Sequence, residues 1–326
     1  MRTKEKLLEL FENNKGSYFS GADIAEKFSI SRTAVWKSVK ALRKEGYQID
    51  AVQNKGYCLS VDTDILSVQG IQKYLNTICP DMELNVYPIL DSTNAVVREK
   101  AIAGGPEGYI VIANSQTRGR GRSGRTFYSP SNTGIYMSLL LRPRHFSSHQ
   151  AAQLTTMAAV AVCEAIGSLS GEKAQIKWVN DIYLRGKKVC GILTEGSLSL
   201  EDGSLEYAVL GIGINVSPPT GGFPDEIKDI AGTVFYEAQR DGKNRLAAEV
   251  LNRFMAYYSA SNMLNYVDNY RQRSMVIGKE IQVIFPGYTK RAIAHAIDQN
   301  CHLIVEYEDG QTETLYSGEI SIKITQ

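Results

Sequence analysis

The sequence predicts an α+β protein built from three parts. Residues 1–62 show helical spacing followed by a hairpin, and residues 63–275 alternate strand-like apolar runs with helical stretches. Residues 276–326 show the strict alternation of a small all-β part. A chain of 326 residues has room for two or three domains. Apolar residues make up 43% and charged residues 22%, which argues against extensive disorder.

Charge is distributed unevenly between these parts. Residues 1–60 hold eleven Lys/Arg and seven Asp/Glu, a net charge of +4, whereas the remaining 266 residues hold 25 and 28, a net charge of −3. The whole chain carries only +1, which excludes a uniformly basic nucleic-acid binder but allows a local basic face. Five basic residues and no acidic one occur between Arg32 and Lys44.

Cysteine usage and the N-terminus predict a cytoplasmic protein. The five cysteines are widely spaced without a C-x-x-C pair, so neither a zinc site nor a disulfide framework is indicated. The first residues lack the apolar core of a signal peptide. The apolar stretch at 157–166 contains Glu164 and is too short to span a bilayer, so no membrane association is expected.

The first sixty residues predict three helices and a hairpin. Ser20, in a capping-box pattern, starts the second helix, and Ser31 starts the third, which ends at Gly46. A turn at 54–56 divides the hairpin at 47–59. The apolar residues of the helices follow helical spacing: Leu7, Leu10, Phe11, Ile24, Ala25, Phe28, Val35, Val39 and Leu42.

These elements are typical of a winged helix-turn-helix. The third helix would enter the DNA major groove, because its polar residues lie near its start or off its apolar stripe. The alternative is a small helical interaction domain with solvated basic residues. The hairpin and the acid-free third helix favour DNA binding. The expected contacts are Ser31, Arg32, Thr33, Trp36, Lys37, Lys40 and, at the hairpin tip, Lys55.

A glycine- and arginine-rich loop at 116–125 is the most distinctive central segment. It satisfies G-x-G-x-x-G after a strand at 108–115, but a second strand and not a helix follows, which argues against a dinucleotide site. A protein kinase is excluded because no H-R-D or D-F-G motif follows. Glycine lets the backbone approach an anion, and arginine binds phosphate or carboxylate through paired hydrogen bonds. The loop carries Arg118, Arg120, Arg122 and Arg125.

Four cations in one short loop repel each other without an anion. We therefore expect the loop to be mobile when empty and ordered around a phosphorylated ligand. A flexible solvated loop and a second nucleic-acid contact remain as alternatives. Further polar clusters at 177–181, 186–188 and 211–215 lie where strands should end. Any one of these clusters, taken by itself, could have a purely structural role. Asp and Asn beside several cations are nevertheless what a magnesium–triphosphate site uses.

The residues at 91–94 should cap a helix that follows them, and a second helix is expected at 245–260. From residue 277 the apolar residues alternate as in strands. The dipeptide Asp309–Gly310 indicates a hairpin turn. We expect about five strands in a small β-barrel, which could simply be a stabilising cap.

Taken in order, the motifs resemble the family of bifunctional biotin–protein ligases that also repress the biotin operon. One departure is Val179, where the family usually has proline, so the local backbone keeps an N–H and a freer φ. Another is Ser123, where some relatives have arginine. The motifs are S-R-T-A-V-W-K at 31–37, K-G-Y at 55–57, D-S-T-N at 91–94, G-x-G-R-x-G-R at 119–125, K-W-x-N-D at 177–181, K-K-x-x-G-I-L-x-E at 187–195 and G-I-G-I-N at 211–215.

The resemblance implies a mixed β-sheet flanked by helices, akin to class II aminoacyl-tRNA synthetases, and a role for each matching residue. Catalysis would use Arg120, Arg122, Lys188 and Asp181, with Asp181 also near a Mg²⁺ ion carried by ATP. Biotin would contact Ser92, Thr93, Asn94, Gln116, Gly119, Arg120, Gly121, Arg122, Lys188 and Gly191. ATP and the adenylate would contact Arg122, Arg125, Asn180, Lys188 and Asn215.

The implied reaction activates biotin with ATP to biotinyl-5'-AMP and transfers biotin to a lysine of a biotin carboxyl carrier protein. The adenylate would also act as corepressor, promoting a homodimer that binds operator DNA. Such acyl transfer needs no side-chain nucleophile, only two anions held in line, which fits the cationic loop. Two alternatives stay open: a ligase for lipoate or another carboxylate, and a non-enzymatic transcription factor that senses a ligand.

Overall fold

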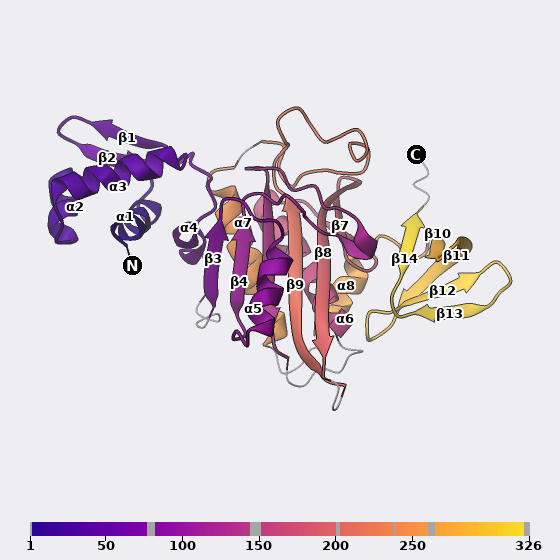
Figure 1. Ribbon diagram of the computed structural model, residues 1–326. Helices are drawn as coiled ribbons and strands as arrows, with labels where there is room; N and C mark the ends of the chain where they lie inside the picture. The colour runs from indigo at the N-terminus through magenta and orange to yellow at the C-terminus, as the bar shows by residue number, and fades with distance from the viewer. Residues whose placement is uncertain are drawn as a thin grey trace. The chain divides into compact units, whose positions relative to one another are not determined.

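The computed structural model describes residues 2–76, 82–143, 151–199, 203–237, 239–259 and 265–322 (Figure 1). The chain forms two compact units, residues 1–76 with 237–249 and residues 77–236 with 250–326. This division follows contacts, whereas the predicted boundaries at 62 and 275 follow sequence pattern, and those boundaries stay predictions. Each unit is described by itself below.

The first unit begins with the predicted three helices and hairpin. Ser20 and Ser31 are N-caps, and their hydroxyls accept hydrogen bonds from the backbone N–H groups of Asp23 and Ala34 at 3.1 and 3.2 Å. The predicted apolar stripes pack into one core, in which Phe28 is partly buried. The elements are α1 (Thr3–Glu12), α2 (Gly21–Lys27), α3 (Arg32–Lys44), β1 (Ile49–Val52) and β2 (Gly56–Leu59).

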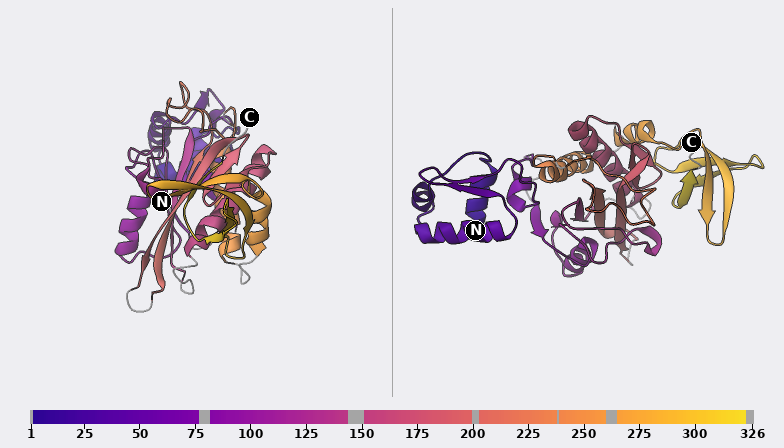
Figure 2. Two further views of the ribbon diagram at one scale, coloured as in Figure 1. Left: turned by 90° about the vertical axis from the view of Figure 1, so that its right-hand side faces the viewer. Right: turned by 90° about the horizontal axis from the view of Figure 1, so that it is seen from above.

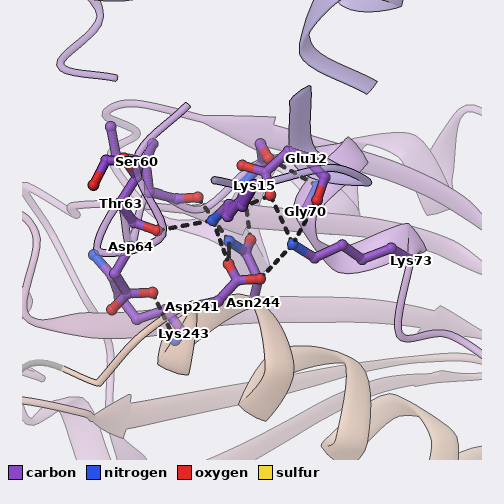
Figure 3. A network of polar contacts seen from close by, with 12 residues as sticks. Glu12, Lys15, Ser60, Thr63, Asp64, Gly70, Lys73, Asp241, Lys243 and Asn244 are labelled. Atoms are coloured by element: carbon purple, nitrogen blue, oxygen red, sulfur yellow. Dashed lines mark hydrogen bonds and ion pairs between the residues drawn. The ribbon is translucent and has the colours of Figure 1, made fainter. Parts of the chain in front are cut away.

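Two further segments complete this unit, the short helix α4 (Val68–Gln72) and the start of α7 (Gly242–Tyr258). A buried ionic network joins them to α1 (Figure 3). Glu12, whose side chain is fully buried, pairs with Lys15 at 3.2 Å and Lys73 at 2.8 Å. Asp241, which is 5% exposed, pairs with the same two lysines and accepts a hydrogen bond from Asn244 at 2.8 Å. Each lysine is therefore shared by two buried carboxylates.

The second unit contains a mixed seven-stranded sheet in the order β3-β4-β5-β9-β8-β7-β6. Only β3 and β4 pair in parallel, and the other neighbours are antiparallel. The strands are β3 (Glu83–Tyr87), β4 (Tyr109–Ala113), β5 (Gly134–Leu141), β6 (Gln175–Lys177), β7 (Asp181–Leu184), β8 (Lys187–Leu198) and β9 (Leu205–Asn215). The mixed sheet with flanking helices agrees with the predicted fold class.

Helices cover both faces of this sheet (Figures 1 and 2). Helix α5 (Thr93–Ile102) lies on one face, where Val97 packs with Val111, Leu140 and Val209. Helices α6 (Ala151–Ser170) and α8 (Asn265–Arg273) lie on the other. Helix α6 extends beyond the apolar stretch at 157–166 and, contrary to expectation, is long and apolar enough to cross a membrane, but 72% of its apolar window is buried within the protein. It is therefore a core helix.

The C-terminal strands form a separate five-stranded sheet in the order β13-β12-β11-β10-β14. The predicted strand number and the turn at Asp309–Gly310 are confirmed, but the predicted closed barrel is wrong for the described residues. Strand β13 pairs with β12 and β14 pairs with β10, so β13 and β14 are the two edges of an open sheet. The strands are β10 (Glu280–Phe285), β11 (Tyr288–Ile297), β12 (Leu303–Tyr307), β13 (Thr312–Leu315) and β14 (Glu319–Ile322).

Candidate functional site

A cavity of about 520 Å³ in the second unit collects most of the predicted site residues. Its walls come from the start of α5, the glycine- and arginine-rich loop, strands β6 to β9 and the C-terminal sheet. Segments that are far apart in the chain thus meet around one space. The predicted residues that line it are Ser92, Thr93, Asn94, Gln116, Arg120, Gly121, Arg122, Arg125, Asn180, Asp181, Lys188 and Gly191.

Two predicted residues do not line this cavity. A Cβ atom built on Gly119 would lie 2.4 Å from the carbonyl oxygen of Phe127, so glycine is needed there for the close approach of two backbone segments. Asn215 donates a hydrogen bond from Nδ2 to the carbonyl of Gly232 at 3.1 Å and thereby holds the segment after β9. Both residues support the walls of the cavity in this structure.

The glycine- and arginine-rich loop folds into a small hairpin. The N–H of Phe127 donates to the carbonyl of Gly119 at 2.9 Å, and the N–H of Gly121 donates to the carbonyl of Arg125 at 2.7 Å. The ring of Phe127 lies over the sheet, where a Cβ atom on Gly213 would come within 2.6 Å of it. The glycine on β9 therefore makes room for an aromatic side chain from the loop.

The cavity also has a strongly cationic part, called its cationic end below, to which the loop, β6, β7, β8 and β14 contribute. Five cations and two carboxylates line it: Arg120, Arg122, Arg125, Lys177, Lys188, Asp181 and Glu319. Lys188 Nζ lies 2.7 Å from Asp181 Oδ1, and Arg125 lies 2.5 Å from Glu319. Burial lowers the pKa of Lys177, which nearby Asp181 offsets only in part. The excess of cations suits a ligand with more than one negative charge.

The part of the cavity lined by the start of α5, called its uncharged end below, is polar and carries no charged side chain. The N–H of Thr93 donates to Gln116 Oε1 at 2.9 Å, and Gln116 Nε2 donates to the Ser129 hydroxyl at 3.1 Å. The residues at 91–94 were expected to cap α5, but the N-cap Ser92 makes no side-chain capping bond. Gln116, from the loop, instead satisfies the first N–H of the helix. The orientation of the Gln116 amide is thereby fixed.

Several cavity residues had no assigned role in the sequence prediction. Lys177 and Trp178 belong to a recognised motif, and the Trp178 indole donates to the carbonyl of Cys301 at 3.0 Å. Arg122 donates to Asn180 Oδ1 at 3.0 Å, which links the loop to the same motif. Residues 284–286 and 317–320 of the C-terminal sheet also line the cavity. The sequence pattern did not indicate which residues of the C-terminal part would reach the cavity.

The carboxylates near the cavity fit a Mg²⁺ ion that arrives with a polyphosphate, but not a resident metal. Across the described residues, no group of three or more His, Cys, Asp or Glu side chains could hold a metal ion. Asp181 is a single carboxylate beside Lys188. Mg²⁺ typically binds through one or two carboxylates together with substrate phosphates. Asp181 therefore fits as a partial ligand of a phosphate-bound ion.

The predicted DNA contacts lie in the first unit and are exposed: Ser31, Arg32, Thr33, Trp36, Lys37, Lys40 and Lys55. Trp36 is 51% exposed, and Lys40 Nζ lies 5.1 Å from the centroid of its ring system. Lys55, at the tip of the hairpin, lies 5.8 Å from the ring centroid of Tyr18. An exposed tryptophan with flanking lysines on α3 is a surface suited to a nucleic-acid backbone and base edges.

Three segments of the chain match known domain families. Residues 3–58 match a helix-turn-helix domain, residues 86–215 match the biotin/lipoate A/B protein ligase family, and residues 276–323 match the biotin protein ligase C-terminal domain. The bifunctional ligase/repressor BirA of Bacillus subtilis is 35% identical, with 98% of each chain covered. BirA of Escherichia coli is 28% identical over 98% of this chain and 96% of its own.

A solved structure has a similar fold over most of the chain. The biotin protein ligase from Aquifex aeolicus, in complex with biotin and ATP, superposes with a TM-score of 0.61 and 26% sequence identity. The match covers 74% of this chain and 98% of that one. The similarity to the two full-length relatives thus extends over 98% of the chain.

Proposed function

This chain belongs to the family of bifunctional biotin ligase/repressor proteins, and we propose from that premise how its cavity carries out the reaction. The protein is a biotin protein ligase that binds biotin and ATP and carries a repressor's helix-turn-helix domain. The observation that supports the following mechanism is that one cavity is lined both by uncharged polar side chains from the start of α5 and by a cluster of cationic side chains. Biotin has matching ends, a ureido ring and a carboxylate.

The ureido ring would bind at the start of α5, with Ser92, Thr93, Asn94 and Gln116. Gly191 would lie beneath the bound molecule, and Arg120 and Gly121 would close over it. Lys188 would lie between the biotin carboxylate and the α-phosphate of ATP. Arg122, Arg125 and Asn180 would hold the nucleotide, with Gly119 and Asn215 supporting the surrounding loops. This arrangement brings two anions together in line, which is the main requirement of the reaction.

In the first step a carboxylate oxygen of biotin attacks the α-phosphorus, and the bond to the β-phosphate oxygen breaks to release pyrophosphate. Arg120, Arg122 and Lys188 stabilise the negative charge on the transferring group. Mg²⁺ bound to ATP, with Asp181 as a protein ligand, would supply further charge neutralisation. In the second step the amine of an acceptor lysine attacks the acyl carbon, and AMP leaves. The protein side chains position and stabilise the reactants without forming a covalent bond.

The test is transfer of labelled biotin to the lysine of a biotin carboxyl carrier protein in the presence of ATP and Mg²⁺. We expect transfer with biotin and none with lipoate, because the uncharged end carries several hydrogen-bonding groups suited to a ureido ring. Pyrophosphate release without transfer would contradict the second step. Absence of both would leave only a ligand-sensing transcription factor.

We further propose that biotinyl-5'-AMP is the corepressor. Its phosphate would order the loop with Arg118, Arg120, Arg122 and Arg125 and promote a two-fold dimer. Such a dimer would present two winged helices to a palindromic operator. Sedimentation should show a doubled mass when biotin, ATP and Mg²⁺ are added together and the monomer mass with any one alone. An unchanged mass with all three would refute ligand-induced dimerisation.

Three finer expectations complete the proposal. The central fold is akin to class II aminoacyl-tRNA synthetases, and the C-terminal sheet contributes to binding of ATP or of the acceptor protein through residues 317–320. A cytoplasmic location is supported by Cys58, Cys163, Cys190 and Cys301, which are buried and free of disulfides. Cys79 lies outside the described residues.

A further inference from the structure

A chain of hydrogen-bonded polar side chains runs from Arg98, within α5, to the uncharged end of the cavity. Arg98 Nη2 donates to both oxygens of Glu195, at 2.8 and 2.9 Å. Asn94 Nδ2 donates to Glu195 Oε2 at 2.7 Å. The Ser138 hydroxyl lies 2.6 Å from Asn94 Oδ1 and 2.7 Å from the Thr93 hydroxyl. Ser138, Thr93 and Asn94 are 0%, 3% and 5% exposed, so water does not compete for these groups.

The proton positions along this chain follow from the number of hydrogens each group carries. An ionised carboxylate only accepts, so Glu195 requires the NH₂ group of Asn94 and leaves Asn94 Oδ1 facing Ser138. Oδ1 also only accepts, and therefore the single proton of Ser138 points to it. The 2.7 Å contact between Ser138 and Thr93 then needs the proton of Thr93. The Thr93 oxygen is left with lone pairs and no proton for the cavity.

Gln116 adds a second acceptor next to Thr93. Its Oε1 atom accepts from the backbone N–H of Thr93 at 2.9 Å and lies 3.2 Å from the Thr93 hydroxyl oxygen. At 3.2 Å the Thr93 hydroxyl could donate to Gln116 Oε1, but its single proton is needed for the shorter 2.7 Å contact with Ser138. These two oxygens therefore face each other without a hydrogen between them. Both residues line the cavity. A ligand N–H that approached both oxygens would relieve this arrangement, whereas a ligand oxygen would worsen it.

Packing holds the chain in this geometry. Gly211 on β9 lies opposite Ser138 on β5 in the sheet register. A Cβ atom built on Gly211 would lie only 2.1 Å from Asn94 Oδ1, so the absence of a side chain lets Asn94 lie against the sheet. Glu195 itself is not among the residues that line the cavity. Any effect of Glu195 on the ligand therefore passes through Asn94, Ser138 and Thr93.

We propose that Glu195 is a positioning residue that sets the hydrogen-bond polarity of the cavity. Held by Arg98, it orients Asn94 and, through Ser138, makes the Thr93 hydroxyl an obligate acceptor that selects a ligand N–H. The inference rests on the proposed function, because biotin supplies such an N–H from its ureido ring. Glu195 thus contributes to specificity without touching the ligand.

The test compares biotin with its two cyclic carbamate analogues, in each of which one ring N–H is replaced by oxygen. We expect the wild-type protein to bind one of these analogues about 100-fold more weakly than biotin, measured by calorimetry. We call the Kd of this analogue divided by the Kd of biotin the discrimination ratio. Glu195→Gln should reduce the discrimination ratio to less than about tenfold. Glutamine can offer its oxygen to Arg98 and its NH₂ to Asn94, which reverses the Asn94 amide and returns a proton to Thr93.

A double variant distinguishes polarity from a merely structural role. Glu195→Gln combined with Asn94→Asp exchanges the amide and the carboxylate, so the side chain at position 94 only accepts again and Ser138 must donate to it. The discrimination ratio should return towards the wild-type value. Ser138→Ala provides an independent break in the chain and should lower the ratio as Glu195→Gln does. It also keeps the test decisive if Glu195→Gln does not fold.

Glu164→Gln is the matched control, because Glu164 is also a half-buried carboxylate paired with arginine, at 3.2 Å from Arg253, and does not line the cavity. The discrimination ratio of Glu164→Gln should equal that of wild type. The inference alone would be overturned if Glu195→Gln discriminated against the analogue as strongly as wild type does. It would also be overturned if the double variant Glu195→Gln/Asn94→Asp did not restore a discrimination that Glu195→Gln had lost. Failure of the wild-type protein to bind biotin would overturn the proposed function, and this inference with it.

Discussion

Lys188→Ala should lower kcat for biotin activation about a thousandfold. Lys188 is placed beside Asp181 in the cationic end of the cavity, with Nζ at 2.7 Å from the carboxylate. Alanine removes a charge where negative charge develops on the α-phosphate, and it leaves Asp181 unpaired in the same place. The measurement is single-turnover release of pyrophosphate from ATP at saturating biotin.

The neighbouring residue supplies the control. Lys187 has the same charge and length, but its Nζ atom contacts the backbone carbonyl of Asp229 and does not line the cavity. Lys187→Ala should retain kcat within about threefold, since its side chain is remote from the charge that develops during activation. If Lys188→Ala retained more than a tenth of wild-type activity, or if both variants lost activity equally, a direct role for Lys188 in charge stabilisation would be wrong.

The elements that sequence pattern predicted well are those specified by neighbouring residues. Helices α2 and α3 were predicted from Ser20 and Ser31, because an N-cap and an apolar stripe act within a few residues of each other. The cationic loop was recognisable for the same reason, since its four arginines lie close together in the sequence. Local chemistry of this kind is visible before any fold is known.

Contacts between distant segments could not be predicted in the same way. The apolar alternation after residue 277 indicated strands, but it could not show that β13 and β14 form the two edges of an open sheet or that residues 317–320 reach the cavity. The partnership of Glu195 with Asn94 spans 101 residues and depends on the register of β8, β9 and β5. A single sequence carries no signal for such a register.

The ionic network of the first unit is another such long-range feature, and its loss should destabilise the protein strongly. Asp241→Asn should lower the free energy of unfolding of the first unit by about 3–5 kcal/mol, because Lys15 and Lys73, which are largely buried, would then share Glu12 as their one ion-pair partner in the network. Hydrogen exchange of the α1 and α4 amides measures this directly. Asp225→Asn, which breaks an exposed pair with Lys228, should cost less than about 1 kcal/mol.

The pH dependence of this loss has a definite sign. Burial alone would raise the pKa of Asp241, but hydrogen bonds from Lys73 and Asn244, together with the charge of Lys15, hold it below its ordinary value of 3.8. The folded state therefore favours the ionised carboxylate, and the stabilisation is complete above pH 3.8 and lost as the pH falls through the lower folded pKa. The difference between wild type and Asp241→Asn, from urea unfolding followed by circular dichroism, should accordingly shrink in acid.

Asp64 titrates with the opposite sign. Burial raises its pKa, and Lys243 offsets only part of the shift, so this group costs stability as the pH rises through its ordinary value. Asp64 is present in both proteins, and the charge of Asp241 is only one of the smaller causes of its raised pKa, so most of its contribution cancels in the difference between them. What remains reports on Asp241 together with its effect on Asp64. A difference that stays constant or grows towards acid would mean that the charge of Asp241 does not stabilise the unit. The structure would then hold α1, α4 and the start of α7 together by packing alone.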